Sequence, residues 1–382
     1  MKITDVTVYV VKPRWIFLKL QTDEGINGWG ECVSGAKTNT VVAGIHEVAK
    51  NFLFGKNPFE IEKLFQEMHR SFYRGGPVNG TVISGLEVAL WDIKGKALNV
   101  PVYELLGGKA KEKVRVYSWI GGDQPHDVAQ QAKKRLDMGF NAIKMNATGA
   151  LHYIDSPQRI SEVVNRIKAI RDCCGDDFDV AIDFHGRVHK GFAKRMAKEL
   201  DPYHPMFLEE VVLPENQEAF RDVAQHVVTP LATGERLYTR WEWKDIFRQG
   251  AIDIVQPDVL LCGGILETRK ILAMAEAYDM AGAPHAPYGP VALAATLQVD
   301  ACTPNVFIQE QSLGIHYNKE YDLLDFVKNK EIFDYKNSFV QIPQGPGLGI
   351  EMDEDFIKKV ASQGLDWHNP SWETYDGSIS EW

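Results

Sequence analysis

The sequence predicts an α/β fold in which a small α+β unit precedes a large parallel barrel. Three observations predict it: strand and helix patterns within the first 110 or so residues, eight short apolar runs after them, and a regular spacing between the polar residues that end those runs. The spacings are 26, 26, 23, 27 and 25 residues for Asp183, Glu209, Glu235, Asp258, His285 and Glu310. A strand, a loop and a helix use about that much chain between parallel neighbours.

The N-terminal unit is expected to begin as a hairpin. Residues Ile3 to Val11 and Ile16 to Gln21 alternate apolar and polar side chains, and turn residues follow at 23–25. Helical patterns come next at 41–54, 61–72 and 83–106, where apolar side chains recur at intervals of three and four. Glycine and proline interrupt these patterns at 75–77 and 107–108. The unit therefore combines a small antiparallel sheet with helices.

The eight apolar runs alternate with amphipathic helical stretches. They span residues 114–120, 142–146, 180–185, 206–209, 231–235, 252–258, 282–285 and 306–310. In a parallel barrel, the carboxyl ends of the strands form the active-site face. We therefore expect the polar residues that end the runs to gather around one mouth.

The C-terminal segment lacks a clear period. It contains a glycine-rich stretch at 345–349 and an aromatic-rich stretch at 367–382. We expect it to pack back onto the N-terminal unit. The predicted divisions are thus residues 1–113, the barrel at 114–340, and a terminal segment at 341–382.

Composition and charge exclude several classes of protein. Of the 382 residues, 45% are hydrophobic and 25% are charged, as in folded globular proteins. A formal net charge of -10 without a basic stripe argues against a nucleic-acid partner. The five cysteines lack the spacing of a disulfide framework or a zinc site, which indicates a reducing compartment. The sequence shows neither a signal peptide nor a long apolar span, so we expect a cytoplasmic protein without a membrane partner.

Three acidic residues on adjacent predicted strands suggest a metal site. Asp183, Glu209 and Glu235 end successive runs, and Mg²⁺ prefers hard oxygen ligands with some positions left for water or substrate. A single acid at a strand end is more often a cap or an ion-pair partner. Three acids in register at one spacing favour the metal.

Two histidines lie at the same predicted mouth. His185 follows Asp183 by two residues and so shares its face of the strand, as a fourth ligand, a proton carrier or a structural histidine. His285 lies one strand beyond Asp258, whose carboxylate can hold the imidazole tautomer and raise its basicity. Glu310 ends the eighth run, either as a protonated donor to an oxyanion or in an ion pair with a lysine or arginine.

The motifs at these positions resemble those of a known family. They include the stretches 13–15, 22–25, 28–31, 72–77 and 89–96 near the N-terminus, and Asp183-Phe184-His185-Gly186-Arg187, Gly234-Glu235-Arg236, Gln256-Pro257-Asp258, Ala283-Pro284-His285 and the run Gln309 to Asn318 in the barrel. Over essentially the whole chain, the sequence resembles the mandelate racemase group of the enolase superfamily. Within that group it is most similar to the D-galactonate dehydratases.

The resemblance implies a (β/α)7β modified TIM barrel under an N-terminal α+β capping domain. It implies one Mg²⁺ per active site, held by Asp183, Glu209 and Glu235. It also implies a small sugar acid as the substrate, bound to the metal through its carboxylate, and a homo-oligomer as the functional form.

The same resemblance implies a reaction. His285, paired with Asp258, would remove the proton α to the carboxylate, and Glu310 would help Mg²⁺ to stabilise the resulting anion. His185 would then protonate the departing 3-hydroxyl, so that a 2-keto-3-deoxy sugar acid forms. The residues that we expect to contact the substrate are Arg14, Trp15 and Asn146.

The second barrel strand separates this chain from other subgroups. Racemases and cycloisomerases of the superfamily resemble one another in a Lys-x-Lys pair, whereas this chain has Lys144-Met145-Asn146. Two opposed histidines suit dehydration of D-galactonate. The alternatives are dehydration of gluconate, mannonate or arabinonate, racemisation or epimerisation of a 2-hydroxy acid, and a catalytically silent binding protein.

Three parts of the sequence depart from the pattern of the D-galactonate dehydratases. Val211 replaces a usual proline, the stretch 259–262 is more apolar than usual, and Tyr288 replaces a smaller apolar residue. These changes concern the barrel mouth, so they bear on which sugar acid is used.

Overall fold

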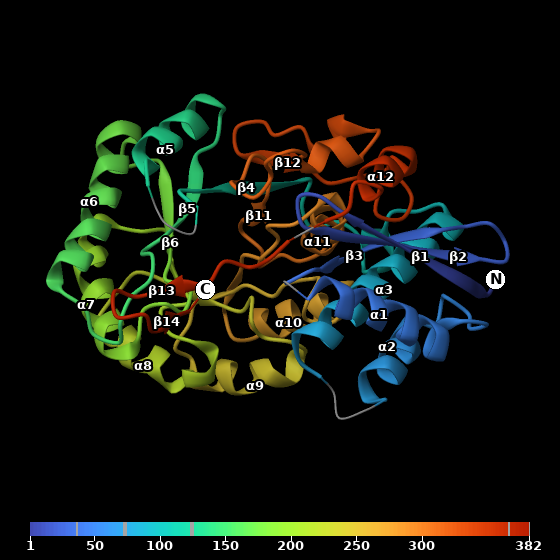
Figure 1. The fold of residues 1–382 in the computed structure, drawn as a ribbon, viewed down its shortest axis with the longest axis horizontal. Coiled ribbons are helices and arrows are strands. Elements are labelled where there is room, and N and C mark those ends of the chain that lie inside the picture. The colour runs from blue at the N-terminus through green and yellow to red at the C-terminus, as the bar shows by residue number, and fades with distance from the viewer. Residues whose placement is uncertain (36, 72–74, 123–125, 366, 382) are drawn as a thin grey trace.

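The computed structural model describes residues 1–35, 37–71, 75–122, 126–365 and 367–381. Figure 1 shows an N-terminal sheet with helices beside a curled parallel sheet ringed by helices. The motif Phe72-Tyr73-Arg74 falls outside the described residues. The α/β class and the capping unit predicted from the sequence are both confirmed.

The capping sheet has three antiparallel strands where the sequence pattern predicted two. They are β1 (Ile3–Val11), β2 (Trp15–Thr22) and β3 (Gly28–Val33), in that spatial order. Strand β3 lies directly on helix α3 (Gly76–Leu98). A Cβ atom on Gly28 would lie 2.1 Å from the carbonyl oxygen of Ala89, so glycine is what permits this close approach. Its glycines made the third strand hard to recognise.

The other capping helices agree with the predicted patterns, with shifted ends. Helix α1 (Thr38–Val48) continues into a short π-helix at Ala49–Leu53, and α2 (Ile61–Arg70) and α4 (Val102–Leu105) follow. Among the described residues, no helix combines the length and apolar character needed to cross a membrane.

The barrel has eight parallel strands and seven connecting helices within the described residues. The strands are β4 (Lys113–Ile120), β5 (Ala142–Asn146), β6 (Asp179–Asp183), β7 (Leu208–Glu209), β8 (Leu231–Thr233), β9 (Ile254–Val255), β10 (Ala281–Gly282) and β11 (Gln309–Gln311). The helices are α5 (Val128–Asp137), α6 (Pro157–Cys174), α7 (Lys190–Leu200), α8 (Glu218–Ala224), α9 (Arg240–Gln249), α10 (Ile265–Glu276) and α11 (Pro290–Ala301).

The ring of strands is closed. Strand β11 pairs with β4, and a parallel bridge between Gly282 and Val306 joins β10 to the residues just before β11. With seven helices between eight strands, the described chain has the expected (β/α)7β arrangement. Strand β12 (Phe339–Gln341) pairs antiparallel with β4.

One layer of buried side chains inside the barrel shows which residues point toward the mouth. It takes one side chain from each strand or the residues beside it, a mixture of alanines and large apolar side chains: Tyr117, Ala142, Ala181, Phe207, Ala232, Ile254, Ala283 and Ile308. Side chains two residues further along a strand point to the same side. Lys144, Asp183, Glu209, His285 and Glu310 each follow a layer residue by two, which places them above this floor, at the mouth.

Two carboxylates of the capping unit accept hydrogen bonds from the N-termini of barrel helices. Glu31 of β3 accepts hydrogen bonds from the backbone nitrogens of Gly289 (2.7 Å) and Ala292 (3.0 Å), at the start of α11. Glu87 of α3 accepts from those of Ile265 (2.7 Å) and Leu266 (3.0 Å), at the start of α10. Carboxylates are favoured at helix N-termini, whose backbone N–H groups lack partners. The cap is thus fixed over the mouth.

The C-terminal segment divides between both parts of the molecule. Helix α12 (Glu354–Ala361) packs on β1, where Glu354 accepts hydrogen bonds from Tyr9 (2.9 Å) and Lys19 (2.6 Å). Beyond it, a hairpin of β13 (Trp372–Glu373) and β14 (Ile379–Ser380) reaches the barrel, near β6 (Figure 1). The expected packing on the capping unit therefore does not extend to the last residues.

Candidate active site

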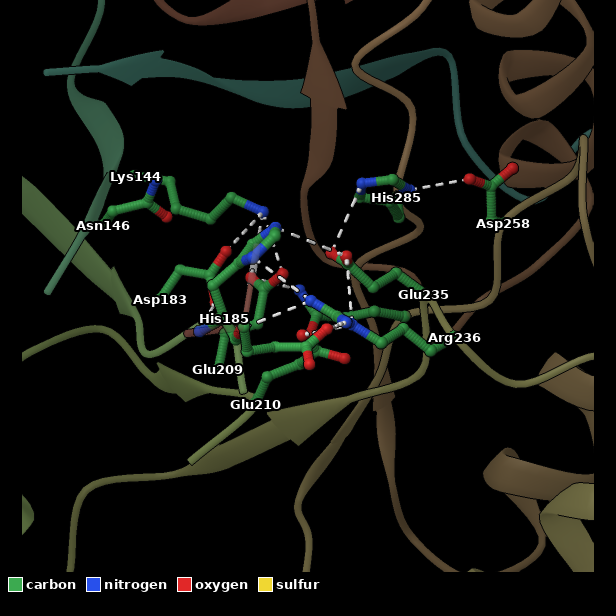
Figure 2. A network of polar contacts seen from close by, with 12 residues as sticks. Lys144, Asn146, Asp183, His185, Glu209, Glu210, Glu235, Arg236, Asp258 and His285 are labelled. Carbon is green, nitrogen blue, oxygen red and sulfur yellow. Dashed lines mark hydrogen bonds and ion pairs between the residues drawn. The ribbon is translucent and has the colours of Figure 1, made fainter. Parts of the chain in front are cut away.

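A cavity that is open to solvent lies between the barrel mouth and the capping unit, with about 470 Å³ of empty space when the open part is included. Barrel strands and their loops supply most of its lining, and the turn after β1 supplies Arg14. The lining residues are Arg14, Trp119, Lys144, Asp183, His185, Glu235, His285, Pro287, Tyr288, Glu310 and Tyr317. Figure 2 shows how the charged members converge from several strands.

Asp183, His185 and Glu235 form the group that could hold a metal. Each offers one ligand atom, and these atoms lie within 4.8 Å of one another. Burial raises the pKa of Asp183, and the neighbouring Glu209 carboxylate raises it further. Burial also opposes ionisation of Glu235, but His285, His185 and Arg236 outweigh it and lower that pKa. The site therefore concentrates negative charge that a cation would relieve.

Glu209 lies close to this group but faces a lysine. The Nζ atom of Lys144 is 2.9 and 3.0 Å from the two carboxylate oxygens of Glu209 and 4.0 Å from Asp183. Gln256 Nε2 donates to Glu209 at 2.7 Å. In the structure His185 therefore lies with Asp183 and Glu235, while both oxygens of the third predicted ligand, Glu209, contact the ammonium of Lys144.

Lys144 was missed as a member of the site. In the sequence it stood out only as half of an absent lysine pair. Its position two residues after the buried Ala142 was the available signal, since that spacing points it into the mouth.

His285 and Asp258 form the pair that the sequence suggested. Asp258 Oδ2 lies 2.7 Å from His285 Nδ1, while the other Asp258 oxygen accepts from the backbone nitrogen of Leu260 at 2.7 Å. His285 Nε2 faces the cavity, 3.3 Å from Glu235. Burial lowers the pKa of His285, but Glu235, Glu310 and Asp258 raise it to about 10. The three carboxylates therefore favour the protonated ring, and a cation that neutralises Glu235 would weaken this preference and free Nε2 to accept a proton.

His185 lies across the cavity in a strained backbone conformation. Its φ is 51°, and its backbone nitrogen donates to Asp183 Oδ1 at 2.6 Å. Nδ1 contacts Arg236 Nη2 at 3.1 Å, and Nε2 is 3.7 Å from Glu235. Burial lowers the pKa of His185 to about 3, despite the opposing effect of Glu235. Arg236 was named in the sequence motif, but its contact with His185 was not foreseen.

Glu310 forms an ion pair, which was one of its two predicted roles. Lys144 Nζ lies 3.0 Å from one oxygen, and the backbone nitrogen of Ala286 donates to the other at 3.1 Å. Both oxygens of Glu310 therefore accept from donors of the protein, an ammonium on one side and a backbone amide on the other.

The three expected substrate contacts have different positions. Arg14 lines the cavity, with its guanidinium 4.0 Å from the centre of the Tyr317 ring. Asn146 is buried at the end of β5, and its Oδ1 has no hydrogen-bond partner among the described residues. Trp15 packs in the core against Phe326 at 5.3 Å and is not part of the lining, so we do not retain it.

Of the three departures, Tyr288 alone lines the cavity. Its ring lies edge-on to that of His285, with 5.6 Å between the centroids. Val211 and the stretch 259–262 are packed in the interior or beside it.

Comparisons with known proteins agree with this arrangement. Residues 127–356 match the family described as enolase C-terminal domain-like, and residues 4–107 match the N-terminal domain of the mandelate racemase / muconate lactonizing enzyme family. Proteins named D-galactonate dehydratase from Ralstonia pickettii and Variovorax paradoxus are 47% and 48% identical to the chain, over 100% of each sequence.

Solved structures give the same result. A mandelate racemase/muconate lactonizing enzyme from a Sulfitobacter species is 32% identical, with a TM-score of 0.88 over 98% of this chain and 100% of that one. A related protein from a Roseovarius species, also 32% identical, gives a TM-score of 0.87 with the same coverage. The chain belongs to the mandelate racemase and muconate lactonizing enzyme group of the enolase superfamily.

Proposed function

We propose that the chain is an Mg²⁺-dependent acid-sugar dehydratase, with D-galactonate as its substrate. The observation that carries the proposal is the placement of His185 and His285, whose Nε2 atoms approach the two oxygens of Glu235 from different strands. Dehydration needs one group to take a proton and another to assist the leaving hydroxyl. The names of the 47% and 48% identical relatives favour this reaction and this acid.

The buried carboxylates fit a hard divalent cation. Four carboxylates are almost wholly buried or line the cavity: Asp183, Glu209, Glu235 and Glu310. Lys144 contacts Asp183, Glu209 and Glu310. We assign Asp183, Glu209 and Glu235 as the Mg²⁺ ligands, with His185 next to them. When bound, Mg²⁺ would neutralise the carboxylate of the substrate and so acidify the adjacent C–H group.

His285 is the base in this proposal. Its Nδ1 is engaged by Asp258, which leaves Nε2 to accept the α-proton on the cavity side. Lys144, which pairs with Glu310, brings its ammonium group to the lining of the cavity, where it would favour the negative charge that develops on the substrate.

His185 is the group that we assign to the leaving 3-hydroxyl. Its Nε2 atom faces the cavity beside Glu235, from where it can pass a proton to the leaving oxygen. After the hydroxyl leaves as water, the remaining enol becomes the 2-keto-3-deoxy acid.

A substrate panel tests the function. Purified protein with Mg²⁺ is incubated with D-galactonate, gluconate, mannonate and arabinonate, and 2-keto-3-deoxy acid is measured. We expect product from D-galactonate, and none after chelation of the metal or with the His285→Asn variant. Deuterium in recovered substrate without keto product would instead indicate a racemase or epimerase. No reaction with any acid would refute the enzyme assignment.

A further inference from the structure

The last described residues of the chain lie against the barrel mouth. Ser380 Oγ is 3.3 Å from the backbone nitrogen of Leu151, in the segment after β5. The rings of His152 and Tyr375 are 4.5 Å apart. In Figure 1 this hairpin, in red, lies among the green elements of the barrel, well away from α12. We call residues 372–381 the C-terminal strap.

Glu381, at the end of the strap, binds Arg236. Arg236 Nη1 lies 2.7 Å from Glu381 Oε1, while Nε donates to Glu210 Oε2 at 3.0 Å. The guanidinium is planar, so two carboxylates on two of its edges fix both its position and its plane. Loss of the Glu381 carboxylate removes one of the contacts that fix this plane.

The third nitrogen of the same guanidinium holds His185. Arg236 Nη2 lies 3.1 Å from His185 Nδ1 and 3.2 Å from its carbonyl oxygen. Because a guanidinium can only donate, Nδ1 accepts and the hydrogen of the neutral ring is on Nε2. Nε2 is the atom that faces Glu235 and the cavity. Figure 2 shows Arg236 between His185, Glu210 and Glu235.

We propose that Glu381 is a positioning residue, which holds the imidazole of His185 through Arg236 with Nε2 toward the cavity. The proposal rests on the proposed dehydratase function, since His185 is the group assigned to the leaving hydroxyl. Glu381 is the better residue to replace in a test, because its side chain is 38% exposed, whereas that of Glu210 is 1% exposed. Replacing Glu381 therefore leaves no buried charge without a partner.

Measuring the two halves of the reaction separately distinguishes a positioning role of Glu381 from a general loss of active-site structure. In the first half, His285 removes the α-hydrogen as a proton, and return of a solvent deuteron to the same carbon labels the substrate. In the second half, the C3–O bond breaks, the electron pair on the α-carbon forms the C2–C3 double bond, and the hydroxyl leaves as water with a proton from His185. Loss of Glu381 should slow the second half and spare the first.

The test measures both halves in one sample. Full-length Glu381→Leu and Glu381→Gln variants are incubated with D-galactonate and Mg²⁺ in deuterated water. We expect Glu381→Leu to lower the ratio of keto product to deuterated substrate about two- to fivefold, as for loss of a partly exposed ion pair, with little change in KM. Glu381→Gln, which keeps an acceptor oxygen, should lie between it and the wild type.

A matched control comes from the same hairpin. Glu373 of β13 is exposed, so Glu373→Leu makes the same chemical change in the strap at a different position. It should leave the ratio unchanged. The proposal is overturned if Glu381→Leu lowers exchange and elimination equally, or if it changes neither.

A second measurement does not depend on turnover. In protein labelled with ¹⁵N-histidine, the His185 nitrogens are identified by their loss in a His185→Asn variant. We expect the wild type and Glu373→Leu to show the hydrogen on Nε2, and Glu381→Leu to show a mixture of the two tautomers. If no acid is consumed by the wild type, the proposed function fails, and an unchanged tautomer in Glu381→Leu then refutes the role of Glu381 separately.

Discussion

Replacing Lys144 with methionine would remove the ammonium that contacts three buried carboxylates. Its Nζ atom lies 2.9 Å from Glu209, 3.0 Å from Glu310 and 4.0 Å from Asp183, and its side chain is 3% exposed. At 3 Å and an effective dielectric constant of about 20, each close contact contributes about 5 kcal/mol before desolvation. After desolvation, loss of one partner from a buried pair costs about 3–5 kcal/mol.

This cost should be visible as a lower melting temperature. For a chain of 382 residues, the unfolding entropy is about 0.8 kcal/mol per kelvin, so we expect Lys144→Met to lower the Tm by about 4–6 °C in the presence of a chelator. The measurement is thermal unfolding followed by circular dichroism. Because a bound divalent cation replaces part of the lost positive charge, Mg²⁺ should raise the Tm of the variant more than that of the wild type.

A surface lysine provides the control. Lys358 lies 3.0 Å from Glu354, but its side chain is 56% exposed, so Lys358→Met should change the free energy of unfolding by less than about 1 kcal/mol. The reasoning is refuted if Lys144→Met melts with the wild type in chelator, or if Mg²⁺ raises both melting temperatures equally.

Three further predictions address other parts of the molecule. Asp258→Asn leaves His285 without its carboxylate partner and should slow α-proton exchange about 10²-fold or more, measured as deuterium incorporation; an unchanged rate would contradict the pairing. Gly30→Ala should destabilise the protein by about 1–3 kcal/mol in denaturant titrations, because its Cβ would lie 2.0 Å from a backbone oxygen of α3; a neutral effect would mean that β3 can move away. Burial tends to raise the pKa of Glu354, but hydrogen bonds from Lys19, Lys358 and Tyr9 outweigh it and lower this pKa to about 2. The stabilisation that Glu354 gives to α12 is therefore complete above about pH 4.5 and is lost as the pH falls toward 2. Hydrogen exchange in α12 should rise over this range in the wild type, and Glu354→Gln should already exchange faster at neutral pH; identical profiles for the two proteins would contradict this.

Regular spacing made the barrel and much of its mouth predictable. Polar residues about 25 positions apart could only be explained by repeated strand–helix units, and the interval of two between Asp183 and His185 fixed their common side. The Asp258–His285 pair followed from the same rule, because neighbouring parallel strands bring their ends together.

Contacts between distant segments were not predictable. Glu381 and Arg236 are 145 residues apart, and no periodic pattern links a C-terminal hairpin to a barrel loop. The pairing of Lys144 with Glu209 could not be predicted for a different reason. Several carboxylates lie within reach of this buried lysine, and only the packed structure determines which of them it contacts.

The division of labour between the two histidines is tested most directly by the His185→Asn variant with D-galactonate and Mg²⁺ in deuterated water. The measurement is the deuterium content of the α-carbon in the recovered substrate, together with the amount of keto product. The account predicts labelled substrate with little or no product, because His285 still removes the α-proton while the leaving hydroxyl lacks its donor. Unlabelled substrate, or product at the wild-type rate, would contradict it.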